Sequence, residues 1–402
     1  MVAGVLVGIW VTRYLGPQEF GLLSFAIAFS AFFTGFARLG LDGILVRELS
    51  LKPSLSRVYM GTAFWLKITA AIFTLAILSI ILLSMIDDYT VKLYILIISS
   101  GVIFQAFDVI DFYFQSKVLS SYIAICKIFQ LVLSSLIKIY LIFVQAELVW
   151  FVMVSLIDQI SLAISLYLIY RSKKIGRFFS YFDLLIAMKL LKESWPYILS
   201  GLVVMAYMRV DQIMIKEMLG DREVGLYSAA VRLCEAWYFM PILITNLLFP
   251  SIITAKKISE NFYYERIQVI YRILIWLALL IAIPMTFLSD WLIRILYGDE
   301  FKGAGLVLAI NIWAGIFIFF GCAWSKWMLI EGRNKMSAFF QINALLWNVG
   351  LNIILIPKFG IYGAALATLI AASIGHIVLP IFIKSQRIAL IMFIKSFWPK
   401  LI

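Results

Sequence analysis

The sequence predicts an all-α, polytopic membrane protein with about twelve transmembrane helices, and its composition and its pattern of hydropathy are the observations that predict it. Of the 402 residues, 64% are hydrophobic and only 14% are charged, and the mean hydropathy is +1.01. Soluble domains are about half apolar and about a quarter charged. A soluble fold of this composition would expose apolar patches that soluble monomers rarely carry, whereas in a bilayer lipid covers such surfaces.

Eleven apolar runs are each long enough to cross the hydrocarbon core as a helix, which takes about 20 residues. They lie near residues 19–37, 60–84, 91–112, 119–143, 148–170, 195–216, 224–252, 267–288, 304–329, 337–356 and 360–383. The chain opens with a shorter apolar stretch, MVAGVLVGIW. Because this stretch lacks the basic leader and cleavage site of a signal peptide, we expect it to be the second half of a truncated first span.

The lysines and arginines of the loops predict the orientation. Twenty of them lie in one set of alternate loops and seven in the other. Cytoplasmic loops carry the excess of basic residues, so we expect the richer set and both termini on the cytoplasmic side of a bacterial inner membrane. The longest loop, about 171–193, falls on that side, and the outer loops are short.

An internal repeat divides the chain into two halves. Residues 15–26 read LGPQEFGLLSFA and residues 219–230 read LGDREVGLYSAA, with seven of twelve positions identical at a constant offset of 204. Each copy is an outer turn that enters the second span of a six-span half, so both halves point the same way. We therefore expect two pseudo-symmetric six-helix lobes, at 1–175 and 176–402. A preference for small residues in helix packing would explain the glycines, but hardly the whole match.

Several classes of chemistry find no support in the sequence. The net charge of +12 comes from basic residues scattered between apolar runs, which is not the basic stripe of a nucleic-acid-binding protein. Cys126, Cys234 and Cys322 lie inside apolar runs and are expected to pack as small apolar residues. A single histidine, His376, cannot build a metal site. We expect no catalytic residue, metal, cofactor or nucleic acid partner.

Twelve ionisable residues lie within the predicted spans, and each would cost about 2.5–3.5 kcal/mol at the centre of a lipid-facing helix. Such residues are expected to pair with one another or to line a wet cavity. They are Lys67, Asp108, Asp111, Lys127, Lys138, Asp158, Arg209, Asp211, Arg232, Glu235, Arg272 and Lys326.

Four of these charges are predicted to lie at one depth. Arg209 and Asp211 precede the turn near residue 221, and Arg232 and Glu235 follow it at similar separations, which places all four about 15–20 Å from the outer turn. The equivalent positions of the first repeat are all apolar: Val5, Val7, Ala28 and Ala31. The cluster is therefore not needed for the shared fold. It either fixes the packing of two helices as an ion-paired network, or it binds a substrate anion or a proton.

The remaining charges suggest further pairs. Lys67 lies at the depth of Asp108 and Asp111, and Lys138 at the depth of Asp158. Lys127, Arg272 and Lys326 lack an obvious carboxylate partner, which suggests an anionic ligand, although Lys326 can also snorkel to the interface. Asn311, Gln341, Asn348 and Asn352 either line a cavity or form hydrogen bonds between helices. The predicted cavity residues are Arg209, Asp211, Arg232, Glu235, Arg272, Lys127, Lys138, Asp108, Asp111 and Lys67.

Three segments resemble a known family. TRYLGPQEFGLLSFAIAF, RVDQIMIKEMLGDREVGLYSAAVRL and YGDEFKGAG are similar to the polysaccharide-transporter family, the Wzx-type O-antigen flippases of the MATE-like exporter superfamily. The resemblance implies two six-helix lobes around a central cavity that opens alternately to each side. It also implies outward movement of an undecaprenyl-pyrophosphate-linked O-antigen or other surface-polysaccharide repeat unit for lipopolysaccharide-type assembly. Membrane lipids, polysaccharide polymerase and chain-length machinery are the other partners it implies.

A mechanism follows as a hypothesis. Arg209, Arg232, Arg272 and Lys127 would supply positive potential for the diphosphate or an acidic sugar. Asp211 and Glu235 would compete for these cations until protonation releases them, which would couple transport to a proton gradient. Two alternatives remain: a MATE-like multidrug exporter, and a membrane enzyme acting on lipid-linked sugars. Seven cations against five carboxylates in the spans favour an anionic cargo, and the short outer loops argue against the enzyme.

Overall fold

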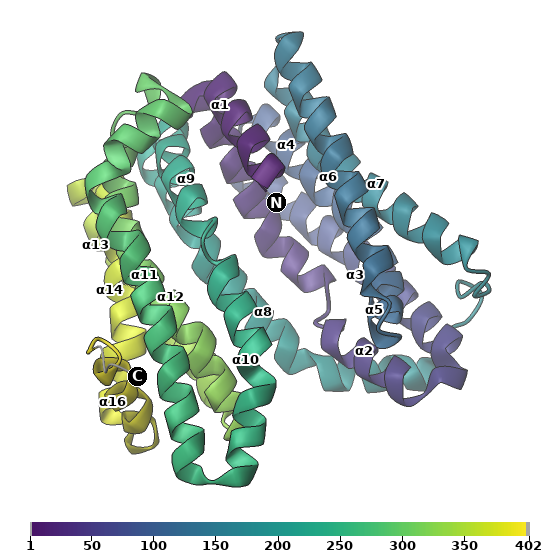
Figure 1. The fold of residues 1–402 in the computed structure, drawn as a ribbon. Coiled ribbons are helices and arrows are strands. Elements are labelled where there is room, and N and C mark those ends of the chain that lie inside the picture. Colours follow the sequence, from purple (N-terminus) through teal and green to yellow (C-terminus); the bar gives the residue numbers. More distant parts are fainter. Residues whose placement is uncertain (1, 399–402) are drawn as a thin grey trace. The chain divides into compact units, whose positions relative to one another are not determined.

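The computed structural model describes residues 2–398, and every regular element in that range is a helix (Figure 1). The predicted all-α fold is confirmed. Eleven helical segments are long and apolar enough to cross a bilayer. Met1 and residues 399–402, which include the C-terminal end predicted to be cytoplasmic, lie outside the described residues.

The first of these segments contains two of the predicted spans. It runs over α1 (Val2–Ala37) and α2 (Asp42–Leu51). Within α1, Gly16 has a φ of 68° and a ψ of 173°, which interrupts the helix before Pro17. Proline favours the first position of a helix because its missing N–H has no partner there. α1 is therefore divided at Gly16 into two helical stretches, at the boundary that the sequence predicts between its first two spans.

The chain forms two compact units. Within the described residues, the first unit contains residues 2–15 and 22–209, and the second contains residues 16–21 and 210–398. A short piece of α1 thus belongs to the second unit, although the helix on both sides of it belongs to the first. The lobe boundary that the sequence places between residues 175 and 176 stays a prediction.

The first unit is built around aromatic side chains near the predicted cytoplasmic ends of its helices. Phe64 lies 5.3 Å from Phe107 and 5.7 Å from Phe178 between ring centroids, with edge-to-face geometry. Such pairs add to the stabilisation from burial. After α2 the unit contains η1 (Pro53–Leu55), α3 (Ser56–Met85), α4 (Tyr89–Ser100), η2 (Gly101–Phe107), α5 (Asp108–Ser116), α6 (Ser120–Phe143), α7 (Leu148–Ser172) and the first part of α8 (Leu184–Leu219).

The predicted loop at 171–193 is wrong in its second half, because α8 begins at Leu184. The carboxylate of Asp183 accepts a hydrogen bond of 2.9 Å from the backbone N–H of Ile186 and so caps this end of the helix. Leu190 is fully buried while Leu185 is 74% exposed. The segment is an amphipathic helical extension, and the search for long apolar runs missed it because it also carries charged residues.

The second unit has its own aromatic core. Trp324 stacks on Phe320 at 5.5 Å, and Phe320 lies 4.9 Å from Tyr271. α11 packs along α12 and α13 along α14 (Figure 1). After α8 the unit contains α9 (Asp221–Glu235), α10 (Phe239–Ile258), α11 (Glu260–Tyr297), η3 (Asp299–Phe301), α12 (Ala304–Ile330), α13 (Asn334–Phe359), α14 (Ile361–Ser373), η4 (Ile374–Val378), α15 (Leu379–Phe382), η5 (Lys384–Gln386) and α16 (Arg387–Lys395).

The span predicted at 224–252 is not one helix. α9 ends at Glu235 and α10 begins at Phe239, with a turn over residues 236–238. Hydropathy does not register this break, because the turn residues Ala236, Trp237 and Tyr238 are themselves apolar or aromatic.

The two copies of the repeat share a backbone feature. Gly16 and Gly220, which the offset of 204 relates, have φ of 68° and 104° with ψ of 173° and −178°. Residues with a Cβ rarely adopt positive φ with extended ψ. Glycine is therefore required at the point where each repeat turns into its next helix.

The repeats also contact each other within the second unit, and glycine makes this contact possible. A Cβ at Gly21 would overlap the backbone carbonyl oxygen of Asp221, and a Cβ at Gly225 would overlap that of Pro17. The offset of 204 relates Pro17 to Asp221 and Gly21 to Gly225. The structure therefore makes one contact twice, as two copies related by a local two-fold axis would. We call this pair of contacts the reciprocal glycine contact.

We expect Gly21→Ala and Gly225→Ala each to destabilise the protein by about 1–3 kcal/mol, the usual cost of overpacking. The added methyl group would meet a backbone carbonyl, which cannot rotate away. The midpoint of thermal unfolding in detergent is the measurement. Gly315→Ala is the matched control, because a Cβ there meets nothing within 4 Å and alanine favours the helix by about 1 kcal/mol. Equal midpoints in all three variants would contradict the expectation.

Candidate functional site

A buried carboxylate in the second unit collects three hydrogen bonds from neutral donors. Asp211 is 5% exposed. Its Oδ2 accepts from the hydroxyls of Tyr227 and Thr368, each at 2.6 Å, and its Oδ1 accepts from Nδ2 of Asn352 at 2.6 Å. An isolated carboxylate is very costly to bury, and several hydrogen bonds reduce this cost. We call these four residues together with Asn348 the Asp211 cluster.

Four helices bring the Asp211 cluster together. Asp211 lies on α8 and Tyr227 on α9, on either side of the turn at Gly220. Asn348 and Asn352 occupy adjacent turns of α13, and Thr368 lies on α14. Nδ2 of Asn352 also donates to Oδ1 of Asn348 at 3.2 Å, and Nδ2 of Asn348 donates to Thr368 at 3.3 Å. The polar groups therefore form one continuous network across the four helices.

The network holds spare hydrogen-bonding capacity. Oδ1 of Asn352 is buried and has no hydrogen-bond partner among residues 2–398, and both side-chain polar atoms of Asn311 on α12 are buried in the same way. Buried polar groups in native proteins are usually satisfied. Asn352 therefore presents a second buried acceptor in the cluster, beside the carboxylate of Asp211.

The charged residues predicted to accompany Asp211 have different surroundings. Arg232 is exposed and its guanidinium lies 5.4 Å from the ring centre of Phe20, a cation–π contact within the second unit. Glu235 is half-buried on α9, and Arg272 is half-buried on α11. Arg209 belongs to the first unit. The hydrogen-bond donors to Asp211 are neutral groups. The competition of Asp211 and Glu235 for the cations Arg209 and Arg232 stays a prediction.

In the first unit, the two charge pairs predicted from helix depth are confirmed. Nζ of Lys67 lies 3.5 Å from Oδ2 of Asp108. Nζ of Lys138 lies 3.6 Å from Oδ2 of Asp158 and donates to Ser134 at 2.8 Å. Lys67 is almost fully buried, at 2% exposure, so its partner offsets a large desolvation cost.

The expectation that Lys127 lacks a carboxylate partner is wrong. Its Nζ lies 3.0 Å from Oδ2 of Asp111, whose Oδ1 accepts a further bond of 2.7 Å from Gln115. Asp111 on α5 and Lys127 on α6 flank the turn at residues 117–119 at nearly equal separations, so the depth argument would have paired them. Lys326 lies 5.2 Å from the ring centre of Phe249.

Residues 10–306 match the family described as "Polysaccharide biosynthesis protein". This match covers well over half of the 402 residues. The chain belongs to the polysaccharide biosynthesis protein family. Together with the eleven apolar helices, this membership makes it a multi-pass membrane protein, as predicted.

Relatives of this polysaccharide biosynthesis protein include the "Probable flippase AglR" of Haloferax volcanii, which is 26% identical over 190 residues. The match covers 44% of this chain and 38% of AglR, so the aligned part spans well under half of that relative.

Two solved structures show the fold. The lipid II flippase MurJ in an inward closed conformation superposes with a TM-score of 0.75 at 15% identity, covering 98% of this chain and 89% of MurJ. An inward-facing multidrug resistance MATE family transporter of the MOP superfamily gives a TM-score of 0.73 at 14% identity, covering 98% and 93%. This polysaccharide biosynthesis protein therefore has the same fold as these two proteins, as its sequence resemblance implied.

Two members of the Asp211 cluster, Tyr227 and Thr368, escaped the sequence analysis, which searched the spans for charges and amides. Tyr227 did leave a signal. It stands where the first repeat has Leu23, one of the five mismatches among the twelve aligned positions. Thr368 left no such signal in the sequence, because 157 residues separate it from Asp211. A threonine hydroxyl in a membrane helix also commonly donates to a backbone carbonyl of its own helix, so a threonine alone does not indicate a site.

We expect Tyr227→Phe to lower the free energy of unfolding by about 1.5–3 kcal/mol, because hydrogen bonds to charged groups contribute that much. Tyr271→Phe is the control, since the buried hydroxyl of Tyr271 has no hydrogen-bond partner in the part of the chain that the structure describes and its removal should cost little. Denaturant unfolding in detergent measures both. A Tyr227→Phe variant as stable as Tyr271→Phe would show that the hydroxyl does not hold Asp211.

Proposed function

We propose that this protein is a flippase that moves a polyprenyl-diphosphate-linked oligosaccharide from the cytoplasmic to the outer face of the inner membrane. The cargo is an O-antigen or other surface-polysaccharide repeat unit, and it crosses by alternating access. The proposal is of transport and not of an enzymatic reaction. The observation that carries it is the excess of cations over carboxylates within membrane spans of a polysaccharide biosynthesis protein.

The physical difficulty of this task lies in the head group. The polyprenyl tail is soluble in the bilayer, whereas a diphosphate and sugars cannot cross hydrocarbon without a large desolvation cost. A flippase must therefore supply a polar and cationic path while the tail stays in lipid. Arg232 is exposed on a predicted membrane span, and the side chain of Lys127, although it is paired with Asp111, is 56% exposed. Cations in such positions are costly against lipid and favourable along a path for an anion.

The Asp211 cluster is proposed as the coupling site. A carboxylate that exchanges a proton changes its charge by one, and the three donors around it must then rearrange their hydrogen bonds. Because those donors lie on α9, α13 and α14, protonation of Asp211 on α8 can change how the four helices pack. This supports a proton-driven cycle.

A multidrug exporter is the second candidate, since the MATE fold is similar. Exporters of organic cations need carboxylates facing the cargo, and a carboxylate held by three neutral donors is the feature of this chain that favours them. The excess of cations in the spans favours the flippase.

We expect Arg209→Ala and Arg232→Ala each to slow transport about tenfold or more, because a charged hydrogen bond to the diphosphate contributes about 1.5–3 kcal/mol. The measurement is exposure of the head group at the outer face of proteoliposomes loaded with undecaprenyl-diphosphate oligosaccharide. Arg294→Ala is the control, because Arg294 is exposed in the last turn of α11 and belongs to neither proposed site.

Normal transport by both arginine variants at unchanged protein level would refute their place on the path. Efflux of an organic cation such as ethidium from the same vesicles, without head-group movement, would identify the exporter instead.

We expect Asp211→Asn to transport at the rate that the unaltered protein shows without a proton gradient, since asparagine keeps the shape but cannot exchange a proton. Parallel assays with and without a proton ionophore measure this. Wild-type transport that is indifferent to the ionophore would exclude proton coupling, and an Asp211→Asn protein that still responds to the gradient would exclude Asp211 as its site.

A further inference from the structure

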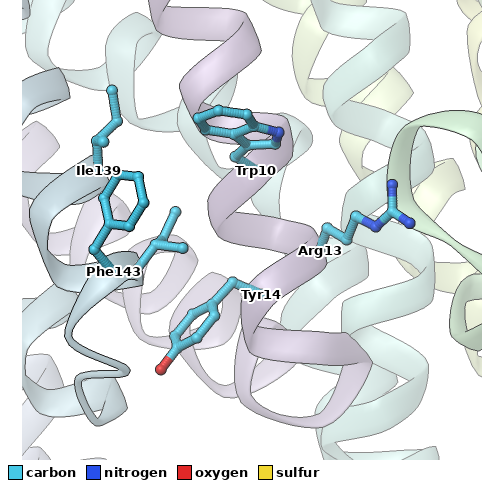
Figure 2. Close-up of a pocket in the computed structure, with 6 residues that line it drawn as sticks. Trp10, Arg13, Tyr14, Ile139 and Phe143 are labelled. Atoms are coloured by element: carbon cyan, nitrogen blue, oxygen red, sulfur yellow. The ribbon is translucent and has the colours of Figure 1, made fainter.

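A pocket of about 350 Å³ lies in the first unit between α1 and α6. Its lining is almost entirely apolar and comes from Trp10 and Tyr14 on α1 and from Ile139, Ile142 and Phe143 on α6, with Arg13 at its rim (Figure 2). Ligand pockets of proteins have volumes of about 300–1,000 Å³. The pocket is at the small end of this range, which suits a segment of one hydrocarbon chain better than the two tails of a phospholipid.

The two helices that form the pocket run parallel and are fixed to each other at both ends of it. A Cβ at Gly4 would lie 3.4 Å from Cδ1 of Leu131. Ten residues further along α1, the hydroxyl of Tyr14 donates a hydrogen bond of 3.0 Å to the carbonyl oxygen of Ala146. A Cβ at residue 4 would be in ordinary van der Waals contact with Leu131, so the helices are neighbours at this end, and the tyrosine bridges them at the other. The pocket is therefore part of the packed unit.

The pocket has a polar end. Arg13 is exposed and makes no hydrogen bond or ion pair with any residue in the described part of the chain. Figure 2 shows its side chain extending from α1 away from Phe143, so its guanidinium stands outside the apolar lining. Trp10 precedes Arg13 by one helical turn, and residues three apart are neighbours on a helix surface. Trp10 and Phe143 are 57% and 79% exposed.

The order of these groups matches an amphiphile. In the orientation predicted from the loop charges, Arg13 lies next to the outer turn at Gly16 while Trp10 and Ile139 lie deeper in the membrane. A ligand would meet a cation at the outer surface and apolar side chains below it. Arginine binds phosphate groups through two parallel hydrogen bonds, and a diphosphate carries more negative charge than the single phosphate of an ordinary anionic phospholipid.

We propose that this pocket is an outer-leaflet binding site for the polyprenyl-diphosphate end of the lipid-linked cargo, with the diphosphate at Arg13 and the first isoprene units against Trp10, Ile139 and Phe143. The proposal rests on the proposed function, because a protein that moves such a lipid outward would meet it at the outer leaflet. The site would receive the carrier lipid after its head group has crossed.

The test is photolabelling of the whole protein in phosphatidylcholine nanodiscs with a benzophenone-bearing geranylgeranyl diphosphate, with the labelled peptides identified by mass spectrometry. We expect label on the segments around residues 10–14 and 139–143. We expect unlabelled geranylgeranyl diphosphate to compete about tenfold better than geranylgeraniol or phosphatidylglycerol, because hydrogen bonds to charged groups contribute about 1.5–3 kcal/mol.

The variants separate the two ends of the site. Arg13→Gln should reduce labelling about tenfold, and Arg13→Lys should keep part of it because the charge remains. Trp10→Ala should weaken competition by geranylgeranyl diphosphate and by geranylgeraniol alike. Arg294→Gln, an exposed arginine outside the pocket, should label normally, and elution from a sizing column confirms that each variant is folded.

Each contrary result is decisive. Label confined to other segments, equal labelling of Arg13→Gln and the unaltered protein, or equal competition by phosphatidylglycerol would overturn the proposal, the last by showing an ordinary anionic-lipid site. Head-group transport measured on the same preparations keeps the two proposals apart. Transport without labelling refutes the pocket alone, whereas labelling without transport refutes the proposed function and leaves a prenyl-diphosphate binding site.

Discussion

The second unit depends on a contact that only glycine permits. At the reciprocal glycine contact, two helices approach so closely that the carbonyl oxygens of Pro17 and Asp221 occupy the places where side chains would begin at Gly21 and Gly225. In a bilayer the hydrophobic effect does not drive helices together, because lipid tails are as apolar as the side chains. Helices associate through close van der Waals packing instead, and small residues allow that close approach. Residues 16–21 are joined to the second unit here, although the rest of α1 belongs to the first.

A second constraint governs the charges, since a bilayer does not solvate them. The first unit meets it by pairing, with Lys67 on Asp108, Lys127 on Asp111 and Lys138 on Asp158. The second unit meets it differently at Asp211, where neutral hydroxyl and amide donors surround the carboxylate. An ion pair holds both of its charges in place. A carboxylate among neutral donors can gain or lose a proton without leaving a cation unpaired, and this difference makes Asp211 the better candidate for a titrating group.

The sequence was sufficient to predict what depends on local composition and on separation along the chain. Apolar runs predicted the spans, and equal distances from a turn predicted the pairs of Lys67 and Lys138. The same argument, applied to α5 and α6, would have found the pair of Lys127. Hydropathy did not predict the start of α8, where charged residues interrupt the apolar pattern. Spacing along the chain did not predict partners that are brought together by tertiary packing. Thr368 reaches Asp211 across 157 residues, and no periodicity or spacing registers such a distance.

The mismatches between the repeats include two residues of the proposed coupling site. Glycines at 16, 21, 220 and 225 are the same in both copies, because the turns and the reciprocal glycine contact require them. Asp211 and Tyr227 stand where the first copy has Val7 and Leu23, and all four side chains are buried. The duplicated backbone therefore holds an apolar pair in one copy and a hydrogen-bonded polar pair in the other. Because a buried carboxylate costs free energy that valine does not, packing alone gives no reason for it. A polar pair in one copy and an apolar pair in the other is what we expect if only one of the two repeats carries the proposed coupling site.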